Sequence, residues 1–151
     1  MNDLLEAKFV SVTPPGAKVD NASWTTASVD TRGFDHCTFV VYLGDLDIAM
    51  TAFKVQESSN DSDYSDITGA TLNGGTDTAG TTTTLPSATD DNKIYLIHVD
   101  MRGRKRYLDL VITGGDGSTG TYLSAMAILS KREQLTSRAT SQFCNGSCIV
   151  V

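Results

Sequence analysis

The residues best suited to chemistry in this chain are two histidines, His36 and His98, and two cysteines, Cys144 and Cys148, in the motif CNGSC. The turn-forming Asn-Gly between the cysteines could bring their sulfurs together, as a small loop disulfide or as half of a zinc site. A structural zinc needs four ligands, and both histidines lie in strand-like runs far away in the sequence. We therefore favour a chain end in which any disulfide forms late, and we expect no metal and no cofactor.

The third cysteine, Cys37, lies in the apolar run HCTFVVYL, which indicates a buried and inert thiol. The chain begins MNDLLEAKFVSV, without the basic and apolar regions of a secretory signal. An odd number of cysteines in such a chain favours reduced thiols, and we expect the protein to stay in the compartment where it is made.

A glycine-rich stretch, GGDGSTG at residues 114–120, has the two glycines of a phosphate-binding loop. The next residue is Thr121, where such a loop needs a lysine, and no helical pattern follows. A hairpin loop is the better interpretation.

The acidic stretch SSNDSDYSD places Asp61, Asp63 and Asp66 close together, as in a calcium loop. That loop needs a central glycine and a ligand at its twelfth position, which here is Leu72. The pattern therefore indicates solvated turn residues.

Nucleophilic catalysis needs a serine or cysteine beside a base, but the sequence has no G-x-S-x-G motif and both histidines lie in strand patterns. We therefore predict that the protein is not an enzyme. In the segment SVDTRGFD, Arg32 lies between Asp30 and Asp35, which predicts a structural ion pair at the start of a strand.

The elements that must position these residues are short strands separated by turn signals. The patterns predict strands at 7–12, 24–30, 36–43, 47–57 and 93–99, with a brief strand or turn near 64–67. Two further apolar runs, 106–113 and 121–130, flank the glycine-rich stretch, and we expect them to pair as a long antiparallel hairpin. Runs 36–43 and 121–130 have apolar residues on both faces.

Residues 69–91 contain almost no large apolar side chain and predict a long loop. After residue 130 the sequence loses its periodicity, and a short helix at 131–135 or an extended tail with an exposed apolar end is expected. The fold class predicted is all-β, a jelly-roll-like antiparallel β-sandwich of about 7–9 strands with extended termini. We expect a single domain, 1–151, with an N-terminal arm at about 1–6 and a C-terminal tail at about 132–151.

The 151 residues carry a net charge of −6, which argues against nucleic acid as the main partner because phosphate binding needs a basic surface. No apolar run reaches the length of a membrane-spanning helix, so we expect no membrane partner.

The motif RGRKR concentrates Arg102, Arg104, Lys105 and Arg106 within five residues of this acidic chain. Exposed basic residues at a turn protect a sheet from edge pairing. They could equally meet an acidic surface on a protein partner, including another copy of this chain, and both interpretations stay open.

Three segments in order, VDTRGFDHCTFVVYLG, FKVQESSNDSDYSDITGA and KIYLIHVDMRGRKRYLDLVITGGDGSTGTYLSAMAILSKRE, resemble small structural proteins of tailed bacteriophages. The chain from about residue 28 to 133 looks like a capsid cement protein, also called a decoration or head-stabilising protein. The resemblance implies a jelly-roll-like sandwich that assembles as a homotrimer on the outer capsid surface and binds the major capsid protein. It also implies localisation in the virion after synthesis in the host cytoplasm.

On this hypothesis the extended termini and the basic turn supply the contacts with capsid or sister subunits. The expected partner-binding residues are Leu4, Leu5, Arg102, Arg104, Lys105, Arg106, Ile149 and Val150. Many weak contacts of this kind would sum through avidity.

Two alternatives remain open. One is a virion or surface carbohydrate-binding sandwich that stacks sugars on Trp24 or on exposed tyrosines, which requires aromatic side chains exposed together in a groove. The other is a head–tail joining protein, which would form rings of six or twelve copies where a cement protein forms trimers.

Overall fold

The computed structural model describes residues 6–131 and 146–151, and all regular secondary structure in these residues is β-strand. The predicted contacts Leu4 and Leu5, the possible helix beyond Lys131 and the thiol of Cys144 lie outside the described residues. None of the residues it covers forms a helix that could cross a membrane. The strands are β1 (Lys8–Thr13), β2 (Val29–Asp30), β3 (His36–Leu43), β4 (Ala52–Ser58), β5 (Ser65–Thr71), β6 (Ile94–Asp100), β7 (Tyr107–Thr113), β8 (Leu123–Ser130) and β9 (Cys148–Val150).

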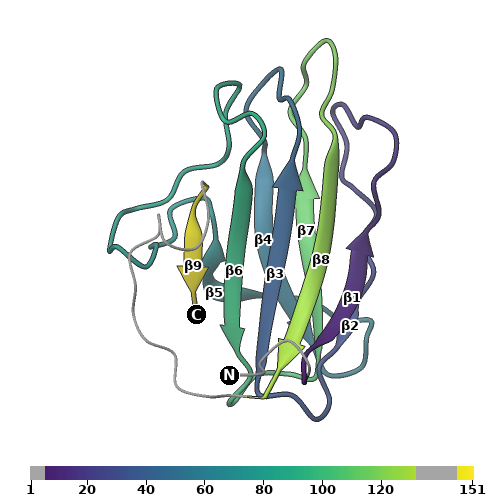
Figure 1. Cartoon of the computed structure of the whole chain (residues 1–151), viewed down its shortest axis with the longest axis vertical. Coiled ribbons are helices and arrows are strands. Elements are labelled where there is room, and N and C mark those ends of the chain that lie inside the picture. Colours follow the sequence, from purple (N-terminus) through teal and green to yellow (C-terminus); the bar gives the residue numbers. More distant parts are fainter. Residues whose placement is uncertain (1–5, 132–145) are drawn as a thin grey trace.

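The strands form two sheets that pack face to face (Figure 1). The five-stranded sheet has the order β1-β8-β3-β6-β9, and the four-stranded sheet behind it has the order β2-β7-β4-β5. All neighbouring strands are antiparallel except β6 and β9, which are parallel. The predicted all-β sandwich is therefore confirmed.

The order of pairing is that of a jelly roll. Strand β1 pairs with β8, β2 with β7, β3 with β6, and β4 with β5, so the first four strands are matched in reverse by the next four. Only β4 and β5 follow each other as a hairpin, and every other connection between successive strands from β1 to β8 crosses from one sheet to the other. A long two-stranded ribbon rolled into two sheets has this connectivity.

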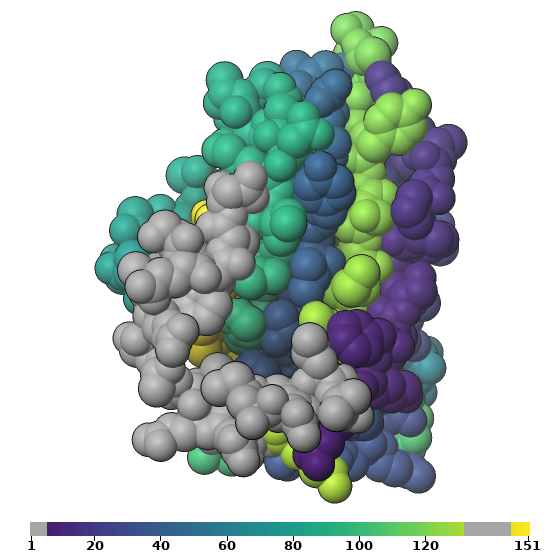
Figure 2. Space-filling model, in the orientation of Figure 1, coloured from purple at the N-terminus to yellow at the C-terminus, as the bar shows by residue number. Residues whose placement is uncertain are grey.

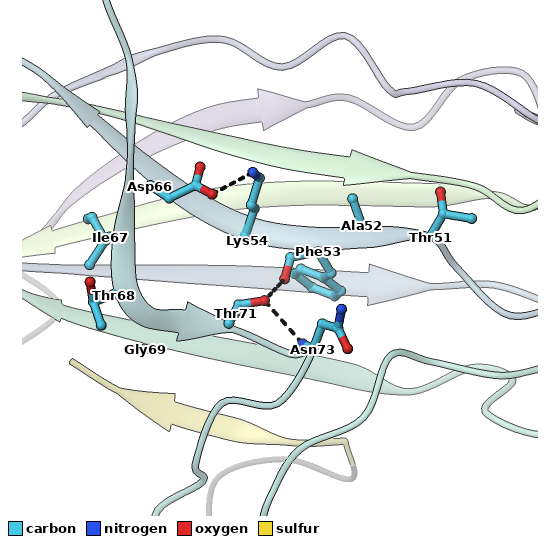
Figure 3. Close-up of a pocket in the computed structure, with 10 residues that line it drawn as sticks. All are labelled: Thr51, Ala52, Phe53, Lys54, Asp66, Ile67, Thr68, Gly69, Thr71 and Asn73. Atoms are coloured by element: carbon cyan, nitrogen blue, oxygen red, sulfur yellow. Dashed lines mark hydrogen bonds and ion pairs between the residues drawn. The ribbon is translucent and has the colours of Figure 1, made fainter.

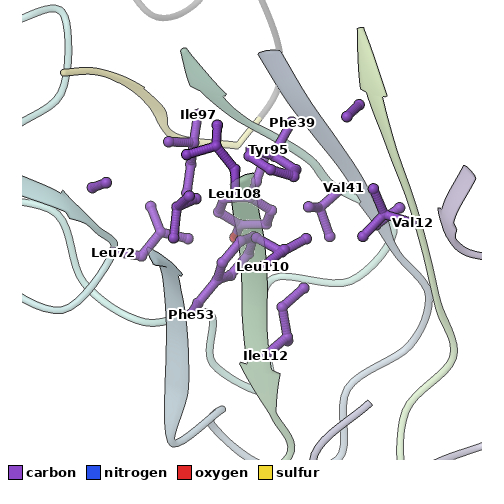
Figure 4. Packing of buried hydrophobic residues seen from close by; sticks show 14 of the residues in the cluster. Val12, Phe39, Val41, Phe53, Leu72, Tyr95, Ile97, Leu108, Leu110 and Ile112 are labelled. Atoms are coloured by element: carbon purple, nitrogen blue, oxygen red, sulfur yellow. The ribbon is translucent and has the colours of Figure 1, made fainter. Parts of the chain in front are cut away.

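The core lies between the sheets and follows from the period-two pattern of the strands. On β3 the side chains of Phe39 and Val41 point inward and are fully buried, and Leu108 and Leu110 of β7 are buried opposite them. Figure 4 shows these side chains packed together with Phe53 and others from both sheets. Fully burying one such side chain contributes about 1.5–3 kcal/mol to folding, so this layer holds the sheets together.

The prediction that residues 106–113 and 121–130 pair as a hairpin is wrong. The strands themselves form as β7 and β8, but β7 belongs to the four-stranded sheet and β8 to the five-stranded one. The two apolar rows that suggested pairing edge to edge instead face each other across the core. Residues 114–122 therefore connect the two sheets.

The C-terminal residues also differ from the expectation of an extended tail with an exposed end. Residues 148–150 form β9, which pairs with β6 so that Leu96 lies opposite Cys148 and Ile97 opposite Ile149. Ile149 is fully buried because it completes the core beside β6.

The predicted loop at 69–91 begins inside β5, and its two leucines point inward. Leu72 is fully buried and Leu85 packs against the core. The rest is shaped by hydrogen bonds, because the Asp77 carboxylate accepts the backbone N–H groups of Ala79 and Thr81. Asp77 also bridges to Ile149 of β9.

Candidate docking surfaces

The outer face of the five-stranded sheet carries large apolar side chains in contact with water. Phe9 on β1, Tyr42 on β3 and Met126 on β8 are 55%, 48% and 46% exposed, and Tyr122, just before β8, is 50% exposed. The chain neighbours of Tyr42, Tyr122 and Met126 are buried, so these three residues are the outward half of the same alternation that builds the core. Figure 2 shows this face, with β1 along one side and β8 and β3 beside it.

Two adjoining hollows lie among these side chains. One, of about 350 Å³, is lined by Phe9, Pro14, Pro15, Val40, Tyr42 and Met126, among others. The second, of about 330 Å³, is lined by Pro15, Gly16, Tyr42, Tyr122 and Ser124, among others. Both share Pro15, Tyr42 and Ser124, so they form one surface feature above β8. We call this feature, defined by Phe9, Pro15, Tyr42, Tyr122 and Met126, the apolar groove.

The apolar groove is lined by uncharged residues, and the charged group of Lys18 lies next to one of its aromatic rings. None of its lining residues in the described chain carries a charge. The ammonium group of Lys18 lies 5.2 Å from the centre of the Tyr122 ring, which is within cation–π range. The groove can therefore bury apolar or aromatic groups without removing a charge from water, apart from this lysine.

The basic turn, residues 102–106, joins β6 to β7 at one end of the sandwich. The Arg102 guanidinium donates three hydrogen bonds to the Asp100 carboxylate, and the shortest, from Nη2 to Oδ2, is 2.6 Å. The ammonium group of Lys105 donates to Ser65 Oγ at 2.9 Å. Arg104 is partly exposed and takes part in no ion pair within the described chain. Arg104 and Lys105 are therefore the cations of this turn best placed to meet a partner.

Arg106, the fourth predicted contact, has an internal partner. Its guanidinium donates to both carboxylate oxygens of Asp30 and lies 4.6 Å from the centre of the Tyr107 ring. The hydrogen bond from Arg106 holds the pKa of Asp30 well below its usual range. The ion pair predicted for Asp30 therefore forms, but with Arg106 in place of Arg32. The antiparallel pairing of β2 with β7 explains this, because it places Tyr107 opposite Asp30.

The apolar end of the chain is only partly accessible to a partner. Ile149 is fully buried within its own chain and cannot contact another subunit unless β9 detaches. Val150 points the other way and is 43% exposed.

The outer face of the four-stranded sheet has a different hollow, of about 390 Å³ (Figure 3). It arises because β4 and β5 lose their register: Lys54 lies opposite Thr71, but Gln56 lies opposite Asp66. The extra residues of β5 bend at Gly69, whose φ of +87° suits glycine. Lys54 and Asp66, which line this hollow, form an ion pair of 2.7 Å. Hydrogen bonds from Lys54 and Gln56 lower the pKa of Asp66. We call this hollow, with the ten residues labelled in Figure 3, the polar pocket.

The glycine-rich stretch does form an anion-binding loop, but the protein's own carboxylate fills it. Asp47 Oδ2 accepts the backbone N–H groups of Ser118, Thr119 and Gly120 at 2.7, 2.5 and 3.0 Å. These hydrogen bonds, those of Thr119 and Gly120 first, lower the pKa of Asp47. A phosphate could bind there only by displacing Asp47, so this loop serves to join the ends of the two sheets.

Among the described residues, the thiols of Cys37 and Cys148 and the imidazole of His36 are buried, and the imidazole of His98 is partly buried. Burial raises the pKa of the Cys37 thiol to about 12, in agreement with the predicted buried and inert thiol. His36 and His98 stack with ring centres 5.6 Å apart, and burial, followed by the charge of His36, lowers the pKa of His98 to about 4. Among residues 6–131 and 146–151, no three His, Cys, Asp or Glu side chains come together as a metal site.

The aromatic residues are distributed differently from the sequence expectation. Trp24 is 8% exposed and belongs to the core, so it offers no stacking surface. Tyr42 and Tyr122 do lie together in the apolar groove. Sequence reasoning missed Phe9 as a surface residue, although the signal was present, because the alternation of β1 places Val10 and Val12 on the opposite face.

Comparison of the chain with known protein families, curated proteins and solved structures finds no match. The function must therefore be argued from the surfaces described above.

Proposed function

We propose that this protein is a structural virion protein that binds the outer surface of a tailed-phage capsid and stabilises it as a cement protein. The observation that carries the proposal is the apolar groove, where four large apolar side chains are exposed side by side on a regular sheet. A contiguous apolar surface bounded by polar residues is typical of a protein-docking site. The resemblance of residues 28–133 to cement proteins supplies the identity of the partner, the major capsid protein.

The physical basis of binding is burial of aromatic and thioether side chains against a protein shell. Tyrosine, phenylalanine and methionine are enriched at the centres of protein interfaces, where they bury a large area. A jelly roll supports such contacts well, since its core fixes the backbones of β1, β3 and β8, so that only side chains need to be ordered on binding. The basic turn, through Arg104 and Lys105, adds a charged contact at the end of the same molecule.

The test uses capsid particles stripped of the protein and then incubated with purified variants. Replacing Tyr42 and Met126 together by serine should lower occupancy at least about tenfold, because truncating interface anchors costs more than 1 kcal/mol each. The matched control is Lys54→Ser with Asp66→Ser on the opposite face, which should leave occupancy unchanged. Equal occupancy for both double variants would show that the groove is not part of the interface with the capsid.

A separate variant tests the basic turn. Replacing Arg104 and Lys105 by serine keeps the Arg102–Asp100 and Arg106–Asp30 pairs, so the fold is preserved. We expect weaker binding to particles and a smaller dependence on salt, because fewer charges are screened. Unchanged affinity and unchanged salt dependence would mean that Arg104 and Lys105 do not contact the capsid and only protect the sheet from edge pairing.

One observation favours a second candidate function, a carbohydrate-binding sandwich. Tyr42 and Tyr122 are exposed together in one groove, which is the arrangement that stacking on sugars requires. On this alternative the isolated protein binds members of a glycan array, and Tyr122→Ala abolishes the signal. A silent array together with binding to stripped particles would favour the cement function.

A further inference from the structure

The ammonium group of Lys18 lies at the Tyr122 end of the apolar groove, 5.2 Å from the centre of the tyrosine ring. Lys18 is exposed and forms no ion pair with another residue of the described chain. The described residues that line the groove carry no charge. A cation beside an uncharged groove can select a partner by the charge that the partner carries.

Backbone contacts hold residues 18 and 122 side by side. The backbones of Val19 and Thr121, their chain neighbours, exchange two hydrogen bonds of 3.0 and 2.9 Å. Tyr122 is also held by Gly44, whose N–H donates to the Tyr122 carbonyl at 2.8 Å. A Cβ atom at position 44 would lie 3.1 Å from Tyr122 Cβ, so this close contact suits glycine. Binding at Lys18 therefore requires ordering of side chains and not of the backbone.

Two neighbouring carboxylates form other contacts. Asp20, two residues after Lys18, accepts the backbone N–H of Gly117 at 3.0 Å. Asp45, in the loop after β3, accepts the side-chain amide of Asn92 at 3.0 Å. Neither of these carboxylates neutralises the charge of Lys18.

We propose that the apolar groove binds a segment of the major capsid protein that places an apolar side chain between Tyr42 and Met126 and a carboxylate beside Lys18. This inference rests on the proposed function, because it states the chemistry that the capsid protein presents to the groove. The apolar side chain gains by leaving water against an uncharged lining. The carboxylate meets a cation at the rim, where it stays in contact with water. The segment therefore carries an aspartate or glutamate within a few residues of its apolar side chain.

The sign of the charge makes the groove selective. A partner with a lysine or arginine at this position would bring two cations together, which is destabilising. The net charge of −6 on the whole chain opposes an acidic partner at long range. Salt at 0.1 M screens this repulsion beyond about 10 Å, whereas the contact with Lys18 is shorter than that. The local charge therefore decides which segments bind.

The first experiment measures the affinity of Lys18 variants for capsid particles stripped of the protein. Lys18→Arg keeps the cation and should bind like wild type. Lys18→Met keeps a long apolar side chain but loses the charge, so the affinity should fall by up to about fivefold, the upper range for an exposed ion pair. Lys18→Glu should bind more weakly than Lys18→Met, because it places a second carboxylate beside that of the partner.

The matched control is Lys54→Glu on the outer face of the four-stranded sheet, which changes the net charge by the same amount. Lys54 forms an exposed ion pair with Asp66, so this substitution should leave the fold intact and the affinity unchanged. An equal loss of affinity at Lys54 would mean that only the net charge matters, and would overturn the contact at Lys18. Wild-type affinity in Lys18→Glu would overturn it as well, while binding to the particles would still support the cement function. No binding by the wild-type protein would reject the cement function and, with it, the capsid protein as the occupant of the groove.

A second experiment needs no capsid. NMR titration compares indole-3-propionate with indole-3-propionamide, which have the same apolar body and differ in charge. The carboxylate should shift the signals of Tyr42, Tyr122 and Met126 at a concentration about two- to fivefold lower than the amide, and Lys18→Met should abolish this difference. Equal concentrations for both compounds in the wild-type protein would overturn the preference for a carboxylate, whichever result the particles give.

Discussion

The outer faces of the two sheets carry different side chains: those of the four-stranded sheet form hydrogen bonds with each other, and those of the five-stranded sheet are apolar and exposed to water. On the four-stranded sheet, outward residues bond to each other: Lys54 to Asp66, and Thr26 to Asp109 at 2.8 Å. On the five-stranded sheet, the outward Phe9, Tyr42 and Met126 have large areas in contact with water. Because a polar face is stable in water by itself and an apolar face gains by being covered, the comparison supports the proposal that the five-stranded sheet is the docking side.

The largest effect is expected from a substitution in the buried layer between the two sheets. Leu110 of β7 is fully buried between the sheets, so Leu110→Ala should lower the free energy of unfolding by about 2–5 kcal/mol through lost burial and a cavity. Urea denaturation measures the change. The control is Met126→Ala on the outer face of the five-stranded sheet, where a change within about 0.5 kcal/mol is expected. A loss at Met126 as large as that at Leu110 would mean that the groove is part of the core.

A smaller effect is expected at Asp47, whose carboxylate binds the glycine-rich loop between β7 and β8. Asp47 has a pKa below its ordinary value of 3.8 because backbone N–H groups bind the ionised form. A lowered pKa in the folded state adds stability above the unfolded pKa, and this stability is lost as pH falls through the folded pKa. Asp47→Asn should therefore be less stable than wild type at pH 7.

The stability difference between Asp47→Asn and wild type should shrink as the pH drops below about 4, because the unfolded chain takes up a proton on Asp47 there while the folded protein does so only at lower pH. Urea denaturation at a series of pH values measures it. Asp116→Asn, a change to an exposed carboxylate in the glycine-rich stretch that Asp47 contacts, is the control. A stability difference at Asp47 that stays constant down to pH 2 would contradict the role of its charge.

The smallest effect on stability is expected from a substitution on the outer face of the four-stranded sheet. The Lys54–Asp66 pair is exposed, and exposed ion pairs contribute less than about 1 kcal/mol. Asp66→Asn should therefore change the free energy of unfolding only slightly, and the change should decrease further in high salt. A large loss would mean that the bend of β5 depends on this pair, and the two faces would then differ less than the structure indicates.

Local patterns were enough to predict most strands. The alternation of Phe39 and Val41 with Val40 and Tyr42 predicted β3, and that of Phe53 and Val55 with Lys54 predicted β4. The same alternation also carried the information that became the apolar groove, because Tyr42 and Met126 occupy the second apolar face of their strands. The all-β jelly-roll class follows from the number and spacing of such strands.

Pairing between distant segments was not predictable in this way, because period-two patterns define the faces of a strand and not its neighbours. The hairpin expected around residues 114–120 failed for this reason, since its two strands belong to different sheets. The partner of Asp30 was misassigned for the same reason, since Arg106 is distant in sequence and adjacent only through the pairing of β2 with β7. The polar pocket had no sequence signal, because it depends on a loss of register between β4 and β5.

The sequence by itself determined the longer strands β3, β6 and β7, which of their side chains face inward, and that Cys37 is buried, because these properties depend on hydrophobic periodicity within a few residues. Only the tertiary structure decided that residues 148–150 complete the core as β9 and that Asp47 fills the glycine-rich loop. Each of these depends on which segments meet in space, and that choice is made by the packing of the whole chain.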